Sequence, residues 1–415
     1  MAEQGDRFRI ALRKFGPFQS ALAKQWDSFE RRNRTGLKLE AVALDLHPLY
    51  DALFASHGLQ QAEWDVALVC TDWLAEAAAS EALLDLAPYI DRNPPDGYPL
   101  AWSDSLLRLQ RFGRRILGMP YHDGPECLIY RKDLFEDAQE RDRFAREFAE
   151  ELKVPSTWNE FRRVARFFTR PRRSLYGTAF AAFPDGHNTV YDFCIQLWTR
   201  GGELFDPSGQ MLLETPQARR ALDFYRTLLN DRNAVHPGSR EFDSVKSGLA
   251  FAAGEIAMMV NWFGFAAMSE TVAESKVKGC VAVAPIPGES GPKASLNAYW
   301  ILAIPAGSPH RHLAWKFLRH CMSKKMDKML TLEGAIGCRK STWQDAEVNS
   351  VIPFYRRLES LHEGARELPR MLNWAQLAAV VDRMVLDAIQ GDEPTARILQ
   401  QSQSRANAIA LAPGP

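Results

Sequence analysis

Hydrophobic positions along the chain follow two alternating patterns. Short apolar runs are followed by longer segments in which apolar residues recur every three or four positions. This alternation is typical of strands and helices that follow one another and stack as α/β layers with parallel sheets. The expected strands are residues 7–12, 37–44, 64–70, 256–260, 279–286 and 299–304, and the expected helices are 15–32, 71–86, 156–168, 214–229, 244–254 and 309–330.

Two of the expected helices begin with capping signals. Thr157 and Glu160 have the spacing of a capping box, in which each side chain accepts a hydrogen bond from the backbone of the other residue. Thr215 precedes Pro216, which is the order of an N-cap and a proline at the first helical position. These signals fix the starts of both helices.

The stretch 248–268 is apolar enough to raise the alternative of a membrane span, since about 20 apolar residues cross a bilayer. It contains Glu255 and Asn261, and Gly248, Gly254 and Gly264 interrupt it. Turns separating short elements explain this pattern better than one membrane helix does. We therefore expect a helix end, a turn at Gly254, a strand buried on both faces of a parallel sheet at 256–260, and a turn at 261–264.

Composition places the chain among ordinary globular proteins with at least two domains, because it has 415 residues and 25% of them are charged. Lys plus Arg and Asp plus Glu each number 51, so no net field attracts the chain to nucleic acid or to an acidic membrane. The six scattered cysteines form no CxxC pair and are expected to be structural thiols. The first residues lack a secretory leader, which fits a cytoplasmic protein or a mature form.

Common enzyme and cofactor signatures are absent from the sequence. It has no Walker A loop, no dinucleotide-binding glycine motif, no HExxH and no GxSxG. Asp123 and Glu126 follow a strand-like segment and leave open the alternative of a carbohydrate-active enzyme with an acid and base pair. We expect no catalysis, no cofactor and no metal.

Tryptophans near the ends of expected strands and helices each have an amide or acid within three residues. A sugar needs this combination, because its C–H face stacks on an aromatic ring while its hydroxyls require fixed donors and acceptors. Core packing is an equally good explanation for any one tryptophan. The pairs are Trp73 with Asp72, Trp262 with Asn261, Trp300 with Asn297, and Trp374 with Asn373.

Several motifs in order resemble the extracellular solute-binding proteins of ABC importers, family 1, the branch that includes maltose-binding protein. The resemblance covers nearly the whole chain. Its motifs are EWDVALVCTDWLAEAAASEALLDLAPYI, GRRILGMPYHDGPECLIYRKDLFE, VPSTWNEFRRVARFFT, LWTRGGELFDPSGQMLLETPQARRALDFYRTLL, AFAAGEIAMMVNW, EGAIGCRKS and DAIQGDEPTARILQQSQSRANAIA.

The resemblance implies a two-lobe periplasmic-binding-protein fold of type II, with hinge strands and a ligand cleft that closes between the lobes. It places the N-terminal lobe at 1–119 and 284–336, the C-terminal lobe at 124–281 and 340–415, and the hinge at 120–123, 282–283 and 337–339. It also implies a periplasmic protein, without its signal peptide, that acts as a monomer, delivers its ligand to permease subunits and does not insert into the membrane.

Carried over position by position, the resemblance predicts the ligand-binding residues. Bulky residues in SLNAYWILAI depart from the family pattern and favour a small or tightly enclosed ligand. The predicted residues are Lys14, Phe15, Thr71, Asp72, Trp73, His122, Asp123, His187, Asn188, Asn261, Trp262, Asn297, Trp300, Arg370 and Trp374.

Ligand charge depends on Lys14 and Arg370 in this reading. If both cations face the ligand, it bears a phosphate, sulfonate or carboxylate. If both are surface residues, it is a neutral saccharide or polyol. The resemblance therefore predicts capture of a small carbohydrate or sugar derivative, with an anionic derivative, a carbohydrate-active enzyme and a cytoplasmic sensory protein as alternatives.

Overall fold

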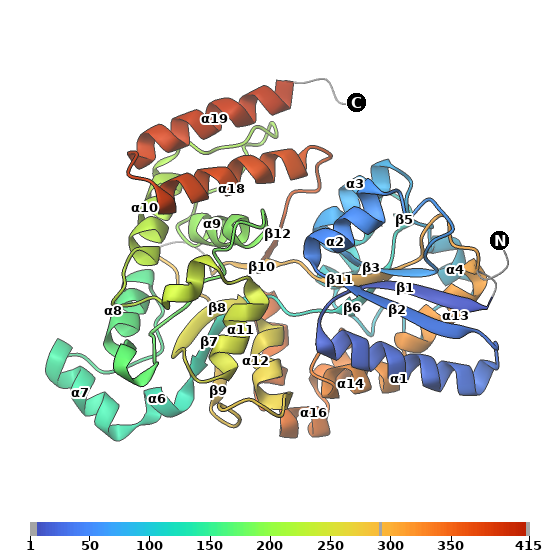
Figure 1. Cartoon of the computed structure of the whole chain (residues 1–415), viewed down its shortest axis with the longest axis horizontal. Coiled ribbons are helices and arrows are strands. Elements are labelled where there is room, and N and C mark those ends of the chain that lie inside the picture. The colour runs from blue at the N-terminus through green and yellow to red at the C-terminus, as the bar shows by residue number, and fades with distance from the viewer. Residues whose placement is uncertain (1–5, 290–292, 412–415) are drawn as a thin grey trace. The chain divides into compact units, whose positions relative to one another are not determined.

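The computed structural model describes residues 6–289 and 293–411, and the chain forms two compact units (Figure 1). Unit 1 consists of Met1–Gly124 and Ala298–Leu358, and unit 2 consists of Pro125–Asn297 and Glu359–Pro415. The chain thus passes from one unit to the other after Gly124, Asn297 and Leu358. Each unit is therefore built from two separate parts of the sequence.

The first crossing follows the expected hinge 120–123 directly, but the other two lie further along the chain than expected. Residues 284–297 belong to unit 2 because β9 (Val281–Ala284) and β10 (Ser295–Asn297) pair with strands of that unit. Residues 340–358 belong to unit 1 because the helices α15 (Lys340–Trp343) and α16 (Ala346–Val351) pack on α14 (Lys324–Leu332). The expected lobe boundary near 282 is therefore displaced past β10, and the expected boundary near 338 is displaced past α15 and α16.

Unit 1 is organised around a five-stranded sheet of order β2-β1-β3-β11-β6. β1 pairs in parallel with β2 and β3, as the sequence predicts, whereas β11 is antiparallel to both β3 and β6. β11 arrives after the second crossing, so it inserts into the sheet without the crossover helix that a parallel strand needs. The strands are β1 Arg7–Arg13, β2 Lys38–Leu44, β3 Val66–Cys70, β6 Met119–His122 and β11 Trp300–Ala303.

Helices cover both faces of this sheet. α1, α13 and α14 lie together on one face, and α2 and α3 lie on the other (Figure 1). α1 buries Phe18, Leu22 and Phe29 from its apolar stripe. The helices are α1 Gly16–Asn33, α2 Leu46–Tyr50, α3 Leu74–Ala79, α4 Ala87–Arg92, α5 Asp104–Leu109, α13 Arg311–Cys321, α14, α15 and α16, and a short hairpin pairs β4 Arg111–Phe112 with β5 Arg115–Ile116.

Two expected helices of unit 1 are shorter than the apolar pattern predicts. The segment 71–86 forms a 3-10 turn and α3, which ends at Ala79, because Glu81 has a left-handed backbone with φ of 49°. The segment 309–330 forms α13 and α14, separated at Ser323, whose extended backbone has ψ of 150°. In both cases the apolar stripe continues through a break in the backbone.

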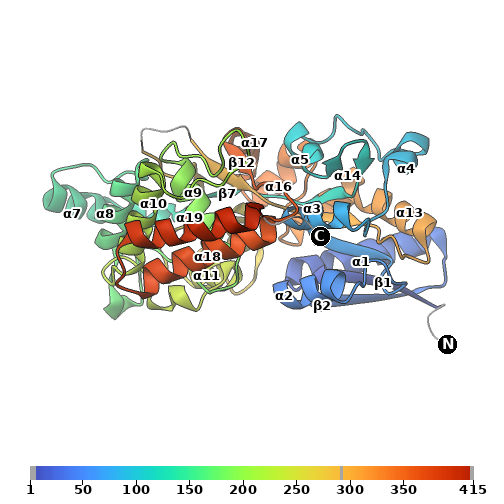
Figure 2. The ribbon, with the colours of Figure 1, turned by 90° about the horizontal axis from the view of Figure 1, so that it is seen from above.

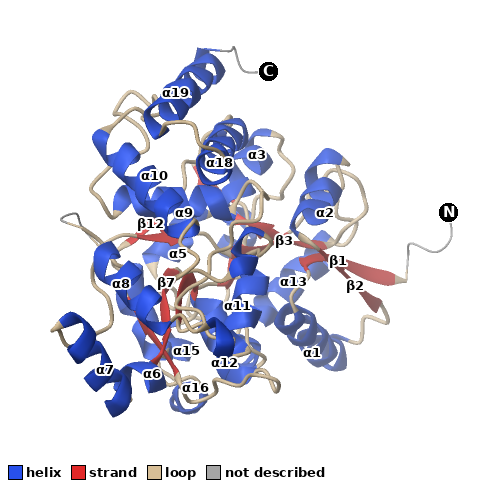
Figure 3. Ribbon diagram, turned by 60° about the vertical axis from the view of Figure 1, so that its left-hand side comes forward, coloured by secondary structure: helices blue, strands red, loops and turns tan. Residues whose placement is uncertain are grey.

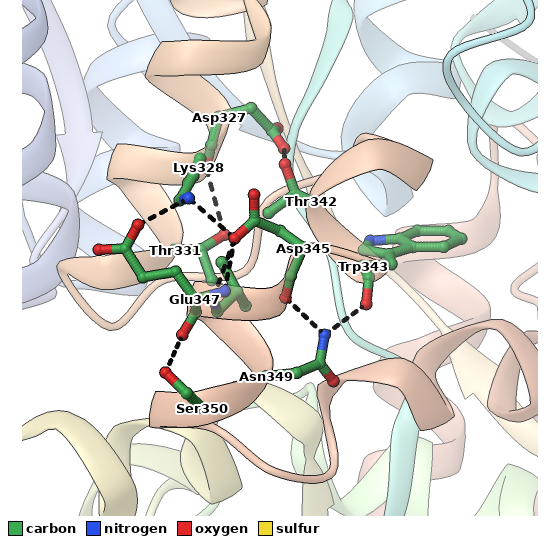
Figure 4. A network of polar contacts seen from close by, with 10 residues as sticks. Asp327, Lys328, Thr331, Thr342, Trp343, Asp345, Glu347, Asn349 and Ser350 are labelled. Carbon is green, nitrogen blue, oxygen red and sulfur yellow. Dashed lines mark hydrogen bonds and ion pairs between the residues drawn. The ribbon is translucent and has the colours of Figure 1, made fainter.

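A buried carboxylate, Asp327 of α14, joins α14 to the turn that precedes α15 and to α15 itself. Figure 4 shows its contact with Thr342 of α15. Its oxygens accept hydrogen bonds from the backbone N–H of Cys338 at 2.9 Å, from that of Arg339 at 3.2 Å and from the hydroxyl of Thr342. At the neighbouring surface, Lys328 pairs with Asp345 at 2.8 Å. Burial raises the pKa of Asp327, and the hydrogen bonds from these donors act against this effect. They give the buried carboxyl oxygens the partners that water would otherwise provide.

Unit 2 contains two small sheets and many helices (Figure 3). β7 lies between β8 and β9 in an antiparallel sheet, and β10 pairs in parallel with β12. The strands are β7 Glu126–Arg131, β8 Met258–Trp262, β9 Val281–Ala284, β10 Ser295–Asn297 and β12 Ala365–Glu367, and the helices are α6 Lys132–Glu136, α7 Ala138–Phe148, α8 Trp158–Phe168, α9 Asn188–Trp198, α10 Pro216–Leu229, α11 Ser244–Ala252, α12 Phe263–Thr271, α17 Leu358–His362, α18 Trp374–Gln390 and α19 Thr395–Leu411.

The packing of unit 2 centres on α9, which is buried along its whole length. α9 contacts α10 and α18, and α18 runs beside α19 (Figure 2). Aromatic and aliphatic side chains from these helices and from α8 form one continuous core. α9 is therefore held rigidly from several sides, which fixes the position of the polar groups in its first turn.

The apolar stretch 248–268 forms the end of α11, β8 and most of α12. β8 begins two residues later than predicted and contains Asn261 and Trp262, for which the sequence predicts a turn. Its sheet is antiparallel and not parallel; contacts with α11 and α12 explain the burial that suggested a parallel sheet. Within the described ranges, no helix combines the length and the apolar character needed to cross a bilayer.

The predicted capping box at the start of α8 is present. The hydroxyl of Thr157 accepts the backbone N–H of Glu160 at 3.2 Å, and the Glu160 carboxylate accepts the N–H of Thr157 at 3.0 Å. Replacing Thr157 with alanine is expected to cost about 1 kcal/mol and to lower the Tm by about 2–4 °C in thermal unfolding. Replacement with serine keeps the acceptor, so an equal loss for both variants would contradict this assignment.

Candidate functional site

In unit 1, the predicted residues gather at the ends of the central strands. Trp300 begins β11, where its neighbours across the sheet are Cys70 of β3 and His122 of β6. Trp73 lies in the turn that follows β3 directly. The strand order β3-β11-β6 thus brings together three segments that are far apart in the sequence.

The rings of these residues touch one another. Trp73 and Trp300 meet edge to face with centroids 5.6 Å apart, and Phe18 of α1 lies 6.4 Å from Trp300 and 4.8 Å from His122. Phe15 lies 6.2 Å from His122. We call Phe15, Phe18, Trp73, His122 and Trp300 the unit 1 aromatic face. Trp300, His122 and Phe15 are half-buried, so this face presents both ring surface and polar edges.

His122 is a neutral hydrogen-bond donor at this face. Its Nδ1 accepts the backbone N–H of Ile336 at 2.8 Å, and the Ile336 carbonyl accepts the N–H of Asp123 at 3.0 Å. Burial lowers the pKa of His122 to about 4 against an opposing contribution from Asp123. The neutral imidazole therefore carries its proton on Nε2.

The other predicted residues of unit 1 are held by local contacts. The Thr71 hydroxyl accepts the backbone N–H of Tyr299 at 3.1 Å, so it fixes the strand end that carries Trp300. Asp72 is half-buried, and Asp123 is buried. Lys14 is exposed, and its Nζ lies 3.7 Å from Asp45 Oδ2. Lys14 therefore shares this carboxylate with Arg13, whose Nη1 lies 2.9 Å from Asp45 Oδ1.

In unit 2, Trp262 at the end of β8 meets Tyr191 of α9 edge to face, with centroids 5.7 Å apart. Tyr191 in turn lies 6.0 Å from His187. We call His187, Tyr191 and Trp262 the unit 2 aromatic face. Trp262 is half-buried, as is His187, so this face is also suited to stacking against an apolar ligand surface.

The residues just before α9 and in its first turn form hydrogen bonds with one another. The Asp185 carboxylate accepts the backbone N–H of His187 at 2.9 Å and of Asn188 at 3.0 Å, and the Asn188 side-chain amide at 2.6 Å. Thr189 donates its hydroxyl to Asp382 of α18. The buried Asn188 therefore stabilises the turn, while the half-buried His187 forms one edge of the aromatic face.

Asn261 and Asn297, which the resemblance also predicts as ligand residues, differ in their surroundings. The Asn261 amide donates to the Ser247 hydroxyl at 2.9 Å and to the Ser244 carbonyl at 3.1 Å, and its oxygen accepts the Trp262 N–H at 2.8 Å. Its hydrogen bonds stabilise the strand end. Asn297 is 3% exposed, and its Oδ1 has no hydrogen-bond partner among the described residues.

Trp374 and Arg370 belong to the surroundings of α18. Trp374 is buried at the start of α18, in the core of unit 2, with its ring 6.5 Å from Phe205. Arg370 is exposed and lies 4.0 Å from the Glu367 carboxylate.

Four further side chains at these faces were not among the predicted binding residues. Phe18 lies on the apolar stripe of α1, and Tyr50 of α2 lies with its ring 5.5 Å from that of Trp73. Tyr191 carries no distinguishing signal. Asp192 does carry one, because it is the only charged residue in the apolar segment 188–198. In the described part of the chain, no group of three or more His, Cys, Asp or Glu side chains is arranged to hold a metal ion.

The fold is that of known binding proteins. Maltose-bound MalE3 of T. maritima superposes with a TM-score of 0.84, 23% identity, and 97% of this chain and 99% of that chain covered. A ribitol-bound ABC transporter solute-binding protein of Agrobacterium radiobacter gives a TM-score of 0.86 at 23% identity, with 98% of this chain and 99% of that chain covered. The architecture is therefore α/β and matches two-lobe periplasmic binding proteins.

Sequence comparison agrees with the fold. A probable ABC transporter-binding protein of Deinococcus radiodurans is 23% identical over 332 residues, which are 78% of this chain and 74% of that protein. The family model of the bacterial extracellular solute-binding protein matches residues 13–328. The chain therefore belongs to the bacterial extracellular solute-binding protein family.

Proposed function

We propose that the chain is the substrate-binding component of an ABC importer and that it binds a neutral sugar or polyol without altering it. The family match over residues 13–328 carries this proposal, and the aromatic faces support it. Solved relatives of the same fold hold maltose, ribitol and D-mannitol. All three are uncharged molecules with many hydroxyl groups.

The unit 1 aromatic face suits such a solute. The half-buried ring of Trp300, which packs edge to face on the buried Trp73, can remove apolar C–H surface of a solute from water, and this contributes about 25 cal/mol per Å². His122 Nε2–H supplies a donor that does not change its charge near neutral pH, since the pKa of His122 is about 4. A hydroxyl bound there keeps a hydrogen-bond partner when water is displaced.

Two observations favour a neutral solute over the anionic alternative. Lys14 and Arg370 are the cations that would recognise an anion, and each has a carboxylate nearby, Asp45 at 3.7 Å and Glu367 at 4.0 Å. Both are exposed, so neither needs an anionic ligand to compensate a buried charge. The chain would act outside the cytoplasm, as a monomer and without catalysis, and would pass its solute to permease subunits.

A thermal-shift panel tests the solute class. We expect ribitol, D-mannitol, D-tagatose or maltose at about 100-fold excess over Kd to stabilise the protein by about 2.7 kcal/mol and to raise the Tm by about 5 °C or more. D-gluconate and glucose 6-phosphate should give no shift. A shift with the anions alone would overturn the neutral class, and calorimetric titration gives Kd for any compound that responds.

A further inference from the structure

Acidic and basic residues are separated between the two helical layers of unit 1. Residues 46–86, which include α2 and α3, contain seven aspartates and glutamates and no lysine or arginine. Residues 311–325, which cover α13 and the start of α14, contain five lysines and arginines and no aspartate or glutamate. These helices lie on opposite faces of the sheet (Figure 1). The zero net charge of the whole chain therefore conceals a strong local asymmetry.

The basic side chains of α13 and α14 meet the end of α1. The His320 ring of α13 packs against Phe29 of α1 with centroids 5.7 Å apart. Burial and the charges of Arg32 and Lys325 lower the pKa of His320, so cations from α1 and α14 both act on this ring. Lys316 lies one turn before His320 on the same side of α13. The name basic face is used below for Arg32, Lys316, Lys324 and Lys325.

The cations of the basic face are exposed and have no ion-pair partner in the fold. All four side chains belong to exposed residues. Other cations of the same helices are paired, Lys24 with Glu333 and Lys328 with Asp345. Among the described residues, no carboxylate lies within ion-pair distance of the four cations of the basic face. Their charge is therefore not offset by the protein itself.

Two of these lysines occupy an unfavourable place for stability. Lys324 and Lys325 are the first two residues of α14. The N-terminus of a helix carries partial positive charge, so lysine is disfavoured in the first turn and a carboxylate is favoured there. The Ser323 side chain does not cap this end, since its hydroxyl donates to the His320 carbonyl at 2.7 Å. A local rule that is broken without compensation in the fold is expected where the residues serve a function.

The surroundings of the basic face distinguish between possible anionic partners. A protein partner needs an apolar or aromatic centre at its interface. A single-stranded nucleic acid needs aromatic rings on which its bases stack, and Trp315 and Phe317 of α13 are buried. Anionic lipid headgroups need only cations at the protein surface. The large apolar side chains that are exposed among the described residues all lie outside α1, α13 and α14: Leu100, Phe183, Leu249, Val351 and Leu372.

We propose that the basic face binds an anionic phospholipid surface, so that unit 1 lies on a membrane through α1, α13 and α14 without inserting. Each lysine or arginine near such a surface raises the partition coefficient about fivefold. The acidic layer of α2 and α3 is repelled by the same surface, which fixes the orientation of unit 1. Binding through charge alone is reversible and sensitive to salt.

Co-sedimentation with vesicles, without any solute, tests the basic face. We expect the full chain to bind phosphatidylglycerol vesicles at low ionic strength and to lose this binding at about 1 M salt, where the screening length is about 3 Å. Phosphatidylcholine vesicles should not bind it. The double variant Lys324→Glu and Lys325→Glu should lower the partition coefficient by about 25-fold or more. Equal binding to both kinds of vesicle, or no binding to phosphatidylglycerol at low salt, would overturn the proposal.

The matched control makes the same charge change in unit 2. Lys276 and Lys278 are exposed lysines of the segment before β9. Their double replacement by glutamate should lower the partition coefficient less than fivefold. An equal loss in both double variants would show that net charge governs the binding, and not the basic face. Thermal unfolding checks the fold, since carboxylates at the start of α14 should leave the Tm unchanged or raise it.

Two further measurements test other partners of the basic face. A DNA duplex that binds the wild type as tightly as phosphatidylglycerol does, at the same salt concentration, would overturn the assignment to lipid. Sedimentation equilibrium tests a second copy of the chain. A dimer of the wild type that is lost in the variant Lys324→Glu and Lys325→Glu would assign the basic face to self-association. We expect a monomer in both cases, and none of these measurements depends on the solute that the chain binds.

Discussion

Replacing Trp300 by alanine is expected to weaken binding of the neutral solute by about 2–3 kcal/mol, which is roughly a 30- to 150-fold increase in Kd. Trp300 joins the rings of Trp73 and Phe18 and lies beside His122 in the sheet, so its removal opens the centre of the unit 1 aromatic face. Calorimetric titration of the wild type and the variant with the best solute of the panel measures the loss.

Two further variants separate binding from folding. Trp300→Phe keeps an aromatic surface and should lose less than tenfold in affinity. Leu100→Ala removes an exposed side chain of the same unit and should bind as the wild type does. An unchanged Kd in Trp300→Ala, with a Tm equal to that of the wild type, would contradict the role of this face.

Replacing Asp327 by alanine is expected to have the largest effect on stability, about 3–5 kcal/mol. The substitution leaves the N–H groups of Cys338 and Arg339 and the hydroxyl of Thr342 without their acceptor in a buried region. Figure 4 shows the contact with Thr342. It also leaves space beside Gly337, where an added Cβ would lie 2.5 Å from the Asp327 carboxylate. Urea unfolding followed by circular dichroism measures the loss.

Lys328→Met is the control for this prediction. Lys328 belongs to the same network but forms its ion pairs with Asp345 and Glu347 at the surface, where solvent screens them. Its midpoint of unfolding should stay close to that of the wild type. A similar loss of stability in both variants would show that the whole network matters, and not the buried carboxylate.

The apolar pattern predicted most elements of the fold, because period and capping are local properties. The capping box at Thr157, the strand 37–44 and the turn at Gly254 lie where they were expected. The antiparallel direction of β8, which pairs with β7, and of β11, which pairs with β3, could not be predicted in this way. A short apolar strand buried on both faces has the same sequence pattern in parallel and antiparallel sheets. The position of the second crossing depends on strand pairing too, whereas that of the third depends on the packing of α15 and α16 on α14.

The candidate site was predicted unevenly for a similar reason. Trp73, His122 and Trp300 come together because they lie at strand ends, and strand ends can be located from the sequence. Asn261 and Trp374 have the same local signal, but tertiary contacts direct the first toward Ser247 and the second into the core. Phe18 and Asp192 lie on helices. There, only the packing of the helix shows whether a side chain reaches an aromatic face or the hydrophobic core.

The late position of β11 in the chain determines when the sheet of unit 1 can form during synthesis. During synthesis, β3 and β6 emerge long before residues 300–303, so the strand that joins them is missing until about three quarters of the chain has left the ribosome. Unit 2 is completed even later, because it includes α18 and α19. Contacts of such large sequence separation favour slow folding. We therefore expect a nascent or truncated chain to stay open and susceptible to proteases until its last helices are added.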